Sequence, residues 1–518
     1  MSSTASATPA APAPIRGATL GLLTFSVAVA TFMEVLDMSI ANVSVPHIAG
    51  DLAVSPNQGT WVISSYGLAS AIAVPLTGWM AKRFGEVRLF VTSVLLFTLM
   101  SLLCGFATSL PMLVTFRLLQ GLVSGPMVPL SQTLLLSNYP PHKKGLALAL
   151  WAMTVVIAPI FGPLLGGWIT DNMSWPWIFY INVPVGLLSA AVTWTLLKRH
   201  ETPTVKLPID AIGLALLVIG VGSLQYVLDN GNEHDWFGST EILSLTVLAV
   251  VALTFLVIWE LTEEHPIVDL RLFKRRNFRY GTLALSLGFF AFFGTTVLFP
   301  LWLQTVMGYT ATWAGIATAP VGILAFLFSP IVGKNVNRVD LRLICSFAFI
   351  VFGITAFWYG SFNLDTPFQN LLWPRVIQGL AVACFFVPVN QIVLSGLNTQ
   401  EIASAAGLAT FFRTLAGSFA TATLITTWDR RATLHHAQLT EQINAYNPAA
   451  TDYLGKLQAL GLTQDAAYAQ VERLINAQGF MIATSEVFWL IAAIFVALIV
   501  VVWLAKPPFG SVGGAGGH

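Results

Sequence analysis

The chain has 518 residues, of which 56% are hydrophobic and only 9% are charged. Soluble domains carry about 25% charged residues, so this composition argues against a water-soluble globular protein. The formal net charge of +1 argues against nucleic-acid binding. Cys104, Cys345 and Cys384 all fall in apolar runs, and we expect them to be reduced packing residues rather than disulfides or metal ligands.

The N-terminal residues 1–17 are expected to form a disordered cytoplasmic tail, because residues 1–15 are rich in Ala, Pro, Ser and Thr. Arg16 then precedes a long apolar run that contains Glu34 and Asp37. A cleaved signal peptide has a shorter apolar region. We therefore expect this run to be retained as a membrane-spanning helix.

A membrane-spanning helix needs about 20 mostly apolar residues. Windows of that length predict an all-α polytopic membrane protein with about 14 spans. The predicted spans lie near residues 18–41, 59–80, 88–108, 111–138, 144–169, 176–197, 211–228, 242–260, 280–303, 312–333, 341–361, 370–396, 401–427 and 483–505. Most Lys and Arg residues outside these spans lie on one side, and on the other side only the long loop 428–482 contains any. The positive-inside rule therefore predicts that both termini are cytoplasmic and that this loop faces outward.

The sequence contains an internal repeat. The segment Arg117–Gly121, RLLQG, returns as Arg375–Gly379, RVIQG, while Thr60-Trp61 matches Thr312-Trp313 and Gly78 matches Gly333. The repeat predicts two six-helix halves, an arrangement in which many secondary transporters enclose a site near the middle of the membrane. The predicted parts are a tail at 1–17, a first half at 18–198, two inserted helices with a cytoplasmic linker at 199–279, a second half at 280–505 and a Gly-rich cytoplasmic tail at 506–518.

Three segments carry motifs, namely Leu36–Val43, Gly78–Arg88 and Ala158–Gly167. With them the chain resembles, over nearly its whole length, the 14-span drug:proton antiporters of the major facilitator superfamily, and among these the EmrB type of Gram-negative multidrug exporter. The resemblance implies the major facilitator fold. It also implies proton-coupled export of hydrophobic or amphiphilic drugs across a bacterial inner membrane, without a cofactor. The implied partners are a periplasmic adaptor of the EmrA type and an outer-membrane channel of the TolC type.

The first span contains two acidic residues, Glu34 and Asp37, on one helix face. A charged side chain at the bilayer centre costs roughly 2.5–3.5 kcal/mol on insertion scales, so both are candidates for a functional role. We expect Asp37 to carry or gate the coupling proton, with Glu34 assisting and Arg117 as their counter-ion. The alternative is an ion pair that only locks the helices together.

The Gly78–Arg88 segment resembles the superfamily's loop between its second and third helices, which implies a role in conformational change for Gly78, Lys82, Arg83, Gly85 and Arg88. Lys82 stands where the family usually has an acid. This departure leaves a simple cytoplasmic anchor as an alternative.

The fifth span resembles the motif that marks antiporters of the superfamily, which implies a role for Pro159, Gly162, Pro163, Gly166 and Gly167. Prolines bend a helix and glycines allow a neighbour to pack closely. The aromatic string Trp175–Pro184 at the start of the sixth span is interpreted as a membrane-interface anchor.

Three further polar residues, Gln132, Asn390 and Arg413, are candidates for the substrate cavity, although such residues more often join helices. In the outer loop, a helix capped by Thr463 is expected to present an apolar stripe that lies on the membrane or binds a partner. The stripe consists of Ala467, Val471, Leu474 and Ile475.

Other functions remain open at this stage. The same scaffold also suits a dedicated exporter of one compound class, such as fatty acids or a secondary metabolite, or a solute importer. A nucleotide-driven pump is disfavoured because Gly333-Lys334 lacks the remaining residues of a phosphate-binding loop. We predict neither catalytic residues nor a metal site, the adjacent pair His435-His436 included.

Overall fold

The computed structural model of the chain is built from helices. It describes residues 15–54, 56–59, 61–140, 143–206, 208–232, 234–336, 338–444 and 446–509. No strand occurs within these ranges. Most of the predicted N-terminal tail, the last residues of the C-terminal tail and Thr60 of the predicted repeat lie outside them.

The helices follow one another with short connections. The first half contains α1 (Ala18–Asp51), α2 (Pro56–Gly59), α3 (Trp61–Ala73), the 3-10 helix η1 (Val74–Leu76), α4 (Thr77–Phe84), α5 (Glu86–Gly105), α6 (Leu110–Ser124), α7 (Met127–Asn138), α8 (Lys144–Asn172), α9 (Trp177–Tyr180) and α10 (Asn182–Leu197). The inserted part contains α11 (Ala211–Asn230), η3 (Trp236–Gly238), α12 (Thr240–Thr262) and η4 (Leu270–Lys274). The second half contains α13 (Arg276–Thr305), α14 (Ala311–Thr318), α15 (Val321–Asn335), α16 (Leu341–Gly360), α17 (Phe368–Leu394), α18 (Thr399–Glu441), α19 (Pro448–Ala459) and α20 (Gln464–Trp503).

Within the described residues, 13 helices are long and apolar enough to cross a membrane. The remaining predicted span, 144–169, coincides with the 29-residue helix α8, some of whose side chains lie outside the described part. These helices confirm the predicted all-α polytopic fold. The exact boundaries of its parts remain a prediction.

Prolines break two of the spans at matching depths. Pro75 lies in η1, where α3 passes into α4, and Pro126 lies between α6 and α7. A proline removes a helical hydrogen bond and bends the chain. The two breaks touch, because a Cβ placed on Gly125 would lie 2.6 Å from Ala73 Cβ. Only glycine lets the backbones approach this closely.

The predicted repeat has matching packing in the two halves. A Cβ placed on Gly121 of α6 would overlap the carbonyl oxygen of Tyr66 on α3, and one placed on Gly379 of α17 would overlap that of Val321 on α15. The repeated glycine therefore lets one helix lie against its neighbour's backbone in each half. The same packing at equivalent positions indicates that the two sequence repeats are structural repeats.

The inserted helix α11 contacts both halves. The rings of Trp61 on α3 and Tyr226 on α11 lie 5.8 Å apart. On its other side Gln225 Nε2 donates to Ser418 Oγ of α18 at 3.0 Å. Helix α12 lies outside α11 and exposes apolar side chains such as Val250 and Phe255, as expected for a helix surrounded by lipid.

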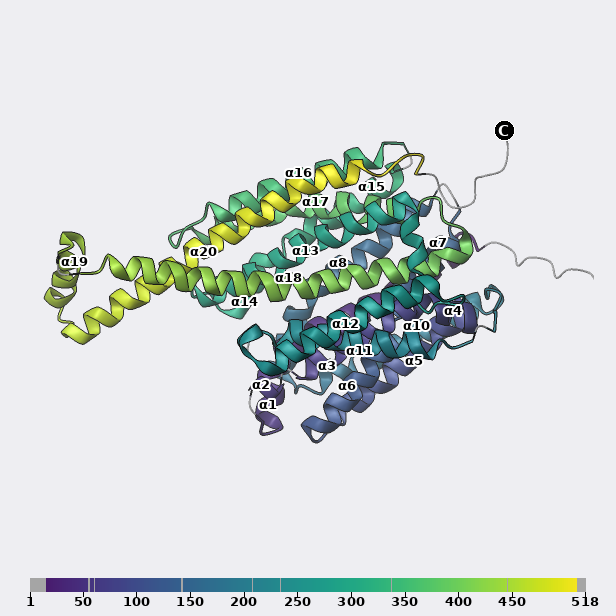
Figure 1. Ribbon diagram of the computed structural model, residues 1–518, viewed down its shortest axis with the longest axis horizontal. Coiled ribbons are helices and arrows are strands. Elements are labelled where there is room, and N and C mark those ends of the chain that lie inside the picture. The colour runs from purple at the N-terminus through teal and green to yellow at the C-terminus, as the bar shows by residue number, and fades with distance from the viewer. Residues whose placement is uncertain are drawn as a thin grey trace, which may run out of the picture.

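The predicted outer loop 428–482 is largely helical. Helices α18 and α20 continue well beyond the bundle as a hairpin that carries α19 at its tip (Figure 1). The expected apolar stripe is not free for a partner: Ala467, Val471 and Ile475 are buried inside the hairpin, and only Leu474 is exposed. They pack there with Leu457 of α19.

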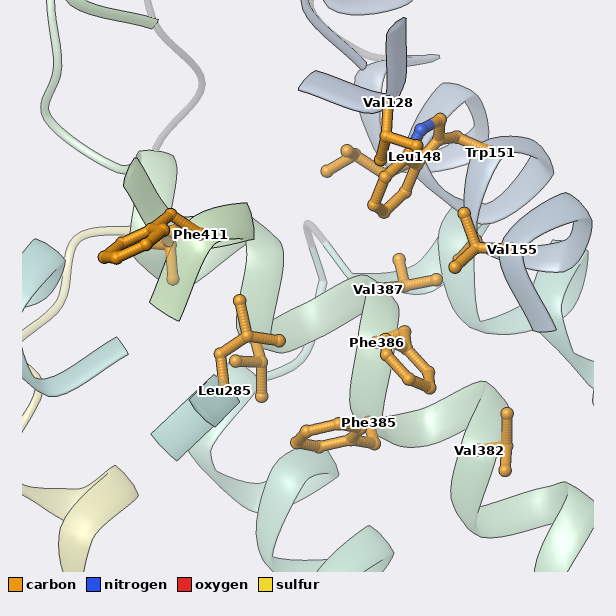
Figure 2. Packing of buried hydrophobic residues seen from close by; sticks show 14 of the residues in the cluster. Val128, Leu148, Trp151, Val155, Leu285, Val382, Phe385, Phe386, Val387 and Phe411 are labelled. Carbon is orange, nitrogen blue, oxygen red and sulfur yellow. The ribbon is translucent and has the colours of Figure 1, made fainter. Parts of the chain in front are cut away.

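The end of the bundle opposite this hairpin is where α4 ends and α20 reaches its last turn (Figure 1). It carries the basic side chains of Lys82, Arg83 and Arg276, and we call it the basic end. One apolar core spans both halves. In Figure 2, Trp151 and Val155 of α8 lie near Phe386 and Val387 of α17, at the interface between the halves.

Candidate functional site

A buried ion pair joins α1 to α6 in the first half. Arg117 Nη1 lies 2.5 Å from Asp37 Oδ2, and the two side chains are 0% and 1% exposed. In so apolar a setting each charge requires the other, since an unpaired buried charge is strongly destabilising. The structure therefore brings together two of the three residues that the sequence predicts for proton coupling.

Amide and hydroxyl groups complete the surroundings of this ion pair. Asn182 Nδ2, at the start of α10, donates to Asp37 Oδ1 at 2.7 Å and to Ser101 Oγ of α5 at 3.0 Å. Arg117 Nη1 also donates to Gln120 Oε1 at 2.8 Å. The network thus links α1, α5, α6 and α10 around one carboxylate, so that a change of its charge acts on four helices.

The guanidinium of Arg117 is fixed on its other sides as well. Its Nε donates to the carbonyl oxygen of Val62 on α3 at 3.0 Å. Its Cζ lies 4.3 Å from the ring centre of Tyr66 and 5.6 Å from that of Phe179, distances at which cation–π attraction operates. Its Nη2 is buried without a hydrogen-bond partner among the described residues.

Glu34 lies one helical turn before Asp37 but outside this network. Its side chain is buried and its Oε2 has no hydrogen-bond partner in the described part of the chain. It interacts electrostatically with Asp37 and with Arg413 of α18. Arg117 is therefore the ion-pair partner of Asp37, whereas Glu34 forms no ion pair among the described residues.

The second half repeats the arginine but not the acid. Arg375 Nη1 donates to Gln378 Oε1 at 2.9 Å, as Arg117 does to Gln120, and its Cζ lies 4.2 Å from the ring centre of Phe299. No carboxylate forms an ion pair with Arg375 among the described residues. The two halves are thus alike in architecture and different in charge.

The predicted antiporter motif packs α8 against α1 beside the ion pair. A Cβ on Gly162 would overlap the side chain of Ser39, and one on Gly166 would lie 3.1 Å from the carbonyl oxygen of Ile40. Gly167 differs, because a Cβ there would meet no described atom within 4 Å. The side chains of the motif prolines, Pro159 and Pro163, lie outside the described residues.

The predicted Gly78–Arg88 loop is held by residues that follow the sixth span. Glu201 accepts from the backbone N–H groups of Val87 at 3.0 Å and Arg88 at 2.8 Å, so that it caps the start of α5. Gly85 has φ +90°, and a Cβ there would meet the Glu201 carboxylate at 2.5 Å. Both facts require glycine at this turn. The guanidinium of Arg83 lies 5.6 Å from the ring centre of Trp79.

Around this loop the two halves touch closely at the basic end. A Cβ on Gly78 of α4 would lie 2.6 Å from Ser404 Cα of α18. Lys82 interacts electrostatically with Glu401 in the first turn of α18, and Glu401 also binds Arg275 at 2.8 Å. The positive charge at position 82 therefore lies within electrostatic range of an acid of the other half.

A second contact between the halves involves α8 and α15. A Cβ on Gly333 would lie 2.6 Å from both Ala149 Cβ and the carbonyl oxygen of Gly145. Deeper in the bundle, Gln132 Nε2 of α7 donates to Asn390 Oδ1 of α17 at 3.2 Å. These contacts close the basic end. Two of the three predicted cavity residues thus bind each other across the interface.

The expectation for Trp175–Pro184 is wrong for two of its four aromatic residues. Trp175 and Phe179 are buried, and only Trp177 is widely exposed as an interface anchor would be. The polar member of the string, Asn182, contacts Asp37 and was missed from the sequence. The signal was a lone amide between apolar residues, in a segment whose aromatic composition resembles a membrane interface.

The chain was compared with known proteins. The protein-family model described as Major Facilitator Superfamily matches residues 27–421 of the chain. The chain is 52% identical to the multidrug export protein EmrB of Escherichia coli (strain K12), over 97% of this chain and 99% of that protein. It is 48% identical to the fatty acid resistance protein FarB of Neisseria gonorrhoeae, over 98% of this chain and 99% of that protein.

Among solved structures, the chain is similar to the proton:xylose symporter XylE, with a TM-score of 0.61 and 13% identity, over 96% of this chain and 97% of that chain. At that identity the likeness concerns the fold alone. The family match, the long relatives and the apolar helices agree with one another. The chain is therefore a multi-pass bacterial membrane transporter that belongs to the major facilitator superfamily.

Proposed function

We propose that this transporter exports hydrophobic and amphiphilic compounds across the bacterial inner membrane, driven by protons that move inward. The similarity to a multidrug export protein at 52% identity supports export of drugs. The observation that carries proton coupling is the Asp37–Arg117 pair, a titratable carboxylate buried among four helices. Titratable residues inside membrane helices are costly and mark proton and substrate paths.

Protonation of Asp37 would remove the charge that compensates Arg117. Breaking a buried ion pair costs about 3–5 kcal/mol, so the helices that carry these residues must rearrange. Helix α1 packs on α8 through Gly162 and Gly166, and α8 meets α15 at the basic end. A shift of α1 is therefore passed to the closed interface between the halves. Coupled opening and closing of this kind is the basis of alternating access.

The direct test uses purified protein in lipid vesicles. An imposed pH gradient should drive accumulation of an amphiphilic dye toward the acidic side, and an ionophore that collapses the gradient should stop it. Accumulation that persists without the gradient would refute proton coupling. A failure to move any of a panel of amphiphilic compounds would refute drug export.

A dedicated exporter of fatty acids is the second candidate function, supported by 48% identity to the fatty acid resistance protein FarB. The two candidate functions differ in the range of compounds that the transporter exports. A panel of structurally unrelated drugs, tested on cells with the gene deleted and restored, separates them. Protection against long-chain fatty acids alone favours the dedicated exporter, whereas protection against several unrelated drugs favours the broad one.

We further propose that the projecting hairpin binds a periplasmic adaptor of the EmrA type, which leads to a TolC-type outer-membrane channel. Support comes from its reach beyond the bundle (Figure 1) and from exposed apolar residues near its tip, Tyr446 and Leu460. Replacing both by Ser should abolish drug resistance in cells and spare transport in vesicles. The matched control replaces Leu457, which is buried inside the hairpin. Loss of transport in vesicles by the tip variant would show that the tip supports the transporter itself.

A further inference from the structure

One buried acid of the first half and one buried arginine of the second half lie outside the Asp37 network. Glu34 belongs to α1 and Arg413 to α18, and both side chains are more than nine-tenths buried. They interact electrostatically, yet no ion pair joins them among the described residues. Neither charge is therefore neutralised by a direct ion pair within the described part of the chain.

Each of the two has a buried polar atom without a partner. Glu34 Oε2 and Arg413 Nε form no hydrogen bond with any described residue. An unsatisfied charged group in the interior is costly, and in a membrane bundle such groups mark functional sites. A bound ligand that supplied the missing hydrogen bonds would remove this cost.

The surroundings of Arg413 are aromatic and come from both halves. Its Cζ lies 5.8 Å from the ring centre of Trp151 on α8 and 5.5 Å from that of Phe289 on α13. The ring of Phe289 in turn lies 5.4 Å from that of Phe293 and 6.2 Å from that of Phe386. Trp151 and Phe386 both belong to the apolar interface seen in Figure 2. A guanidinium beside an aromatic surface suits a ligand with a charged head and an apolar tail.

The sign of that head follows from the buried charges. Asp37 neutralises Arg117. In the second half, Arg375 and Arg413 are buried as well. Glu34 is the one further buried acid in the middle of a span among the described residues, because the other buried acids, Glu86 and Glu260, lie at the ends of α5 and α12. The interior therefore has an excess of positive charge, and an anion complements it better than a cation does. A guanidinium also offers the fork of donors that matches a carboxylate or sulfonate.

We propose that Arg413 binds the anionic headgroup of amphiphilic acids, whose tails pack along the half-buried rings of Phe289 and Phe293. This inference rests on the proposed export function and names a substrate class for it. Glu34 repels the same headgroup and so weakens anion binding. An exporter of this kind handles amphiphilic acids through Arg413 and other amphiphiles through the apolar surface alone.

The test compares two ligands that differ only in permanent charge, dodecanesulfonate and dodecyltrimethylammonium. Binding is measured to the full chain in lipid nanodiscs. Arg413→Gln should weaken dodecanesulfonate binding at least about tenfold, the equivalent of one charge-assisted hydrogen bond, and leave the cation's affinity unchanged. Arg413→Lys, which keeps the charge, should retain most of the anion's affinity. Glu34→Gln should bind the anion more tightly than the wild type.

Unchanged anion binding by Arg413→Gln overturns the proposal, as does an equal loss for both ligands, which would make Arg413 a structural residue. If Arg413→Gln does not fold, Glu34→Gln provides the test. A ratio of anion affinity to cation affinity in Glu34→Gln that equals the wild-type ratio then overturns the proposal. A wild-type protein that exports the cation but not the sulfonate contradicts this inference alone. A wild-type protein that exports neither contradicts the proposed function.

Discussion

The contact between α8 and α15 at the basic end provides a sharp test of how the halves open and close. Replacing Gly333 by Ala places a Cβ 2.6 Å from both Ala149 Cβ and the backbone oxygen of Gly145. Backbone atoms cannot turn away as a flexible side chain can, so the two helices must separate. Overpacking of this kind typically costs about 1–3 kcal/mol. Because these helices touch when this end is closed, the substitution destabilises the closed state.

A shift of about 1–3 kcal/mol changes a two-state equilibrium by roughly 5- to 150-fold. Gly333→Ala should therefore populate the form that is open at the basic end. Distances between spin labels at Lys198 and Arg338, which are exposed on different halves, report this population. Gly167→Ala is the matched control, since its Cβ meets no described atom within 4 Å. An unchanged distance distribution in Gly333→Ala, or the same change in Gly167→Ala, would refute this account of closure.

Three further predictions concern the network, the loop and the orientation. Asn182→Ala removes a donor from the buried Asp37 and should lower the free energy of unfolding by about 1–3 kcal/mol, as thermal denaturation can measure; no change would mean that the amide is dispensable. Lys82→Glu places two acids at the interface with Glu401 and should reduce transport, and adding Glu401→Lys should restore it; a double variant no better than the single one contradicts the pairing. A cysteine at Asn444 should react with an impermeant reagent in intact cells, and labelling only after lysis would reverse the orientation.

Much of the fold could be predicted from the sequence, because in lipid every backbone group must be satisfied within a helix and apolar runs of sufficient length mark the spans. The helical hairpin was not predicted, because an apolar run marks only the part of a helix that lies in lipid. The apolar run of α18 ends near position 427, yet the chain contains neither Gly nor Pro from 418 to 447. The helix therefore continues beyond the apolar run as far as Glu441.

The candidate site was predictable only in part. Isolated charges in apolar runs need partners, which suggested Arg117 for Asp37. That rule does not say which of two neighbouring acids is paired. Asp37 binds Arg117, whereas Glu34 interacts with Arg413 only electrostatically. The bond between Gln132 and Asn390 joins residues 258 positions apart, and no local pattern indicates which residues of two halves meet.

The central claim is that Asp37 couples substrate movement to protons. Its most direct test compares two activities of Asp37→Asn protein in vesicles: exchange of labelled for unlabelled substrate, and accumulation driven by a pH gradient. Asp229→Asn, which changes an acid of the inserted helix α11, serves as the control. We predict that Asp37→Asn keeps exchange and loses gradient-driven accumulation, while the control keeps both. Gradient-driven accumulation at the wild-type rate in Asp37→Asn would contradict the account.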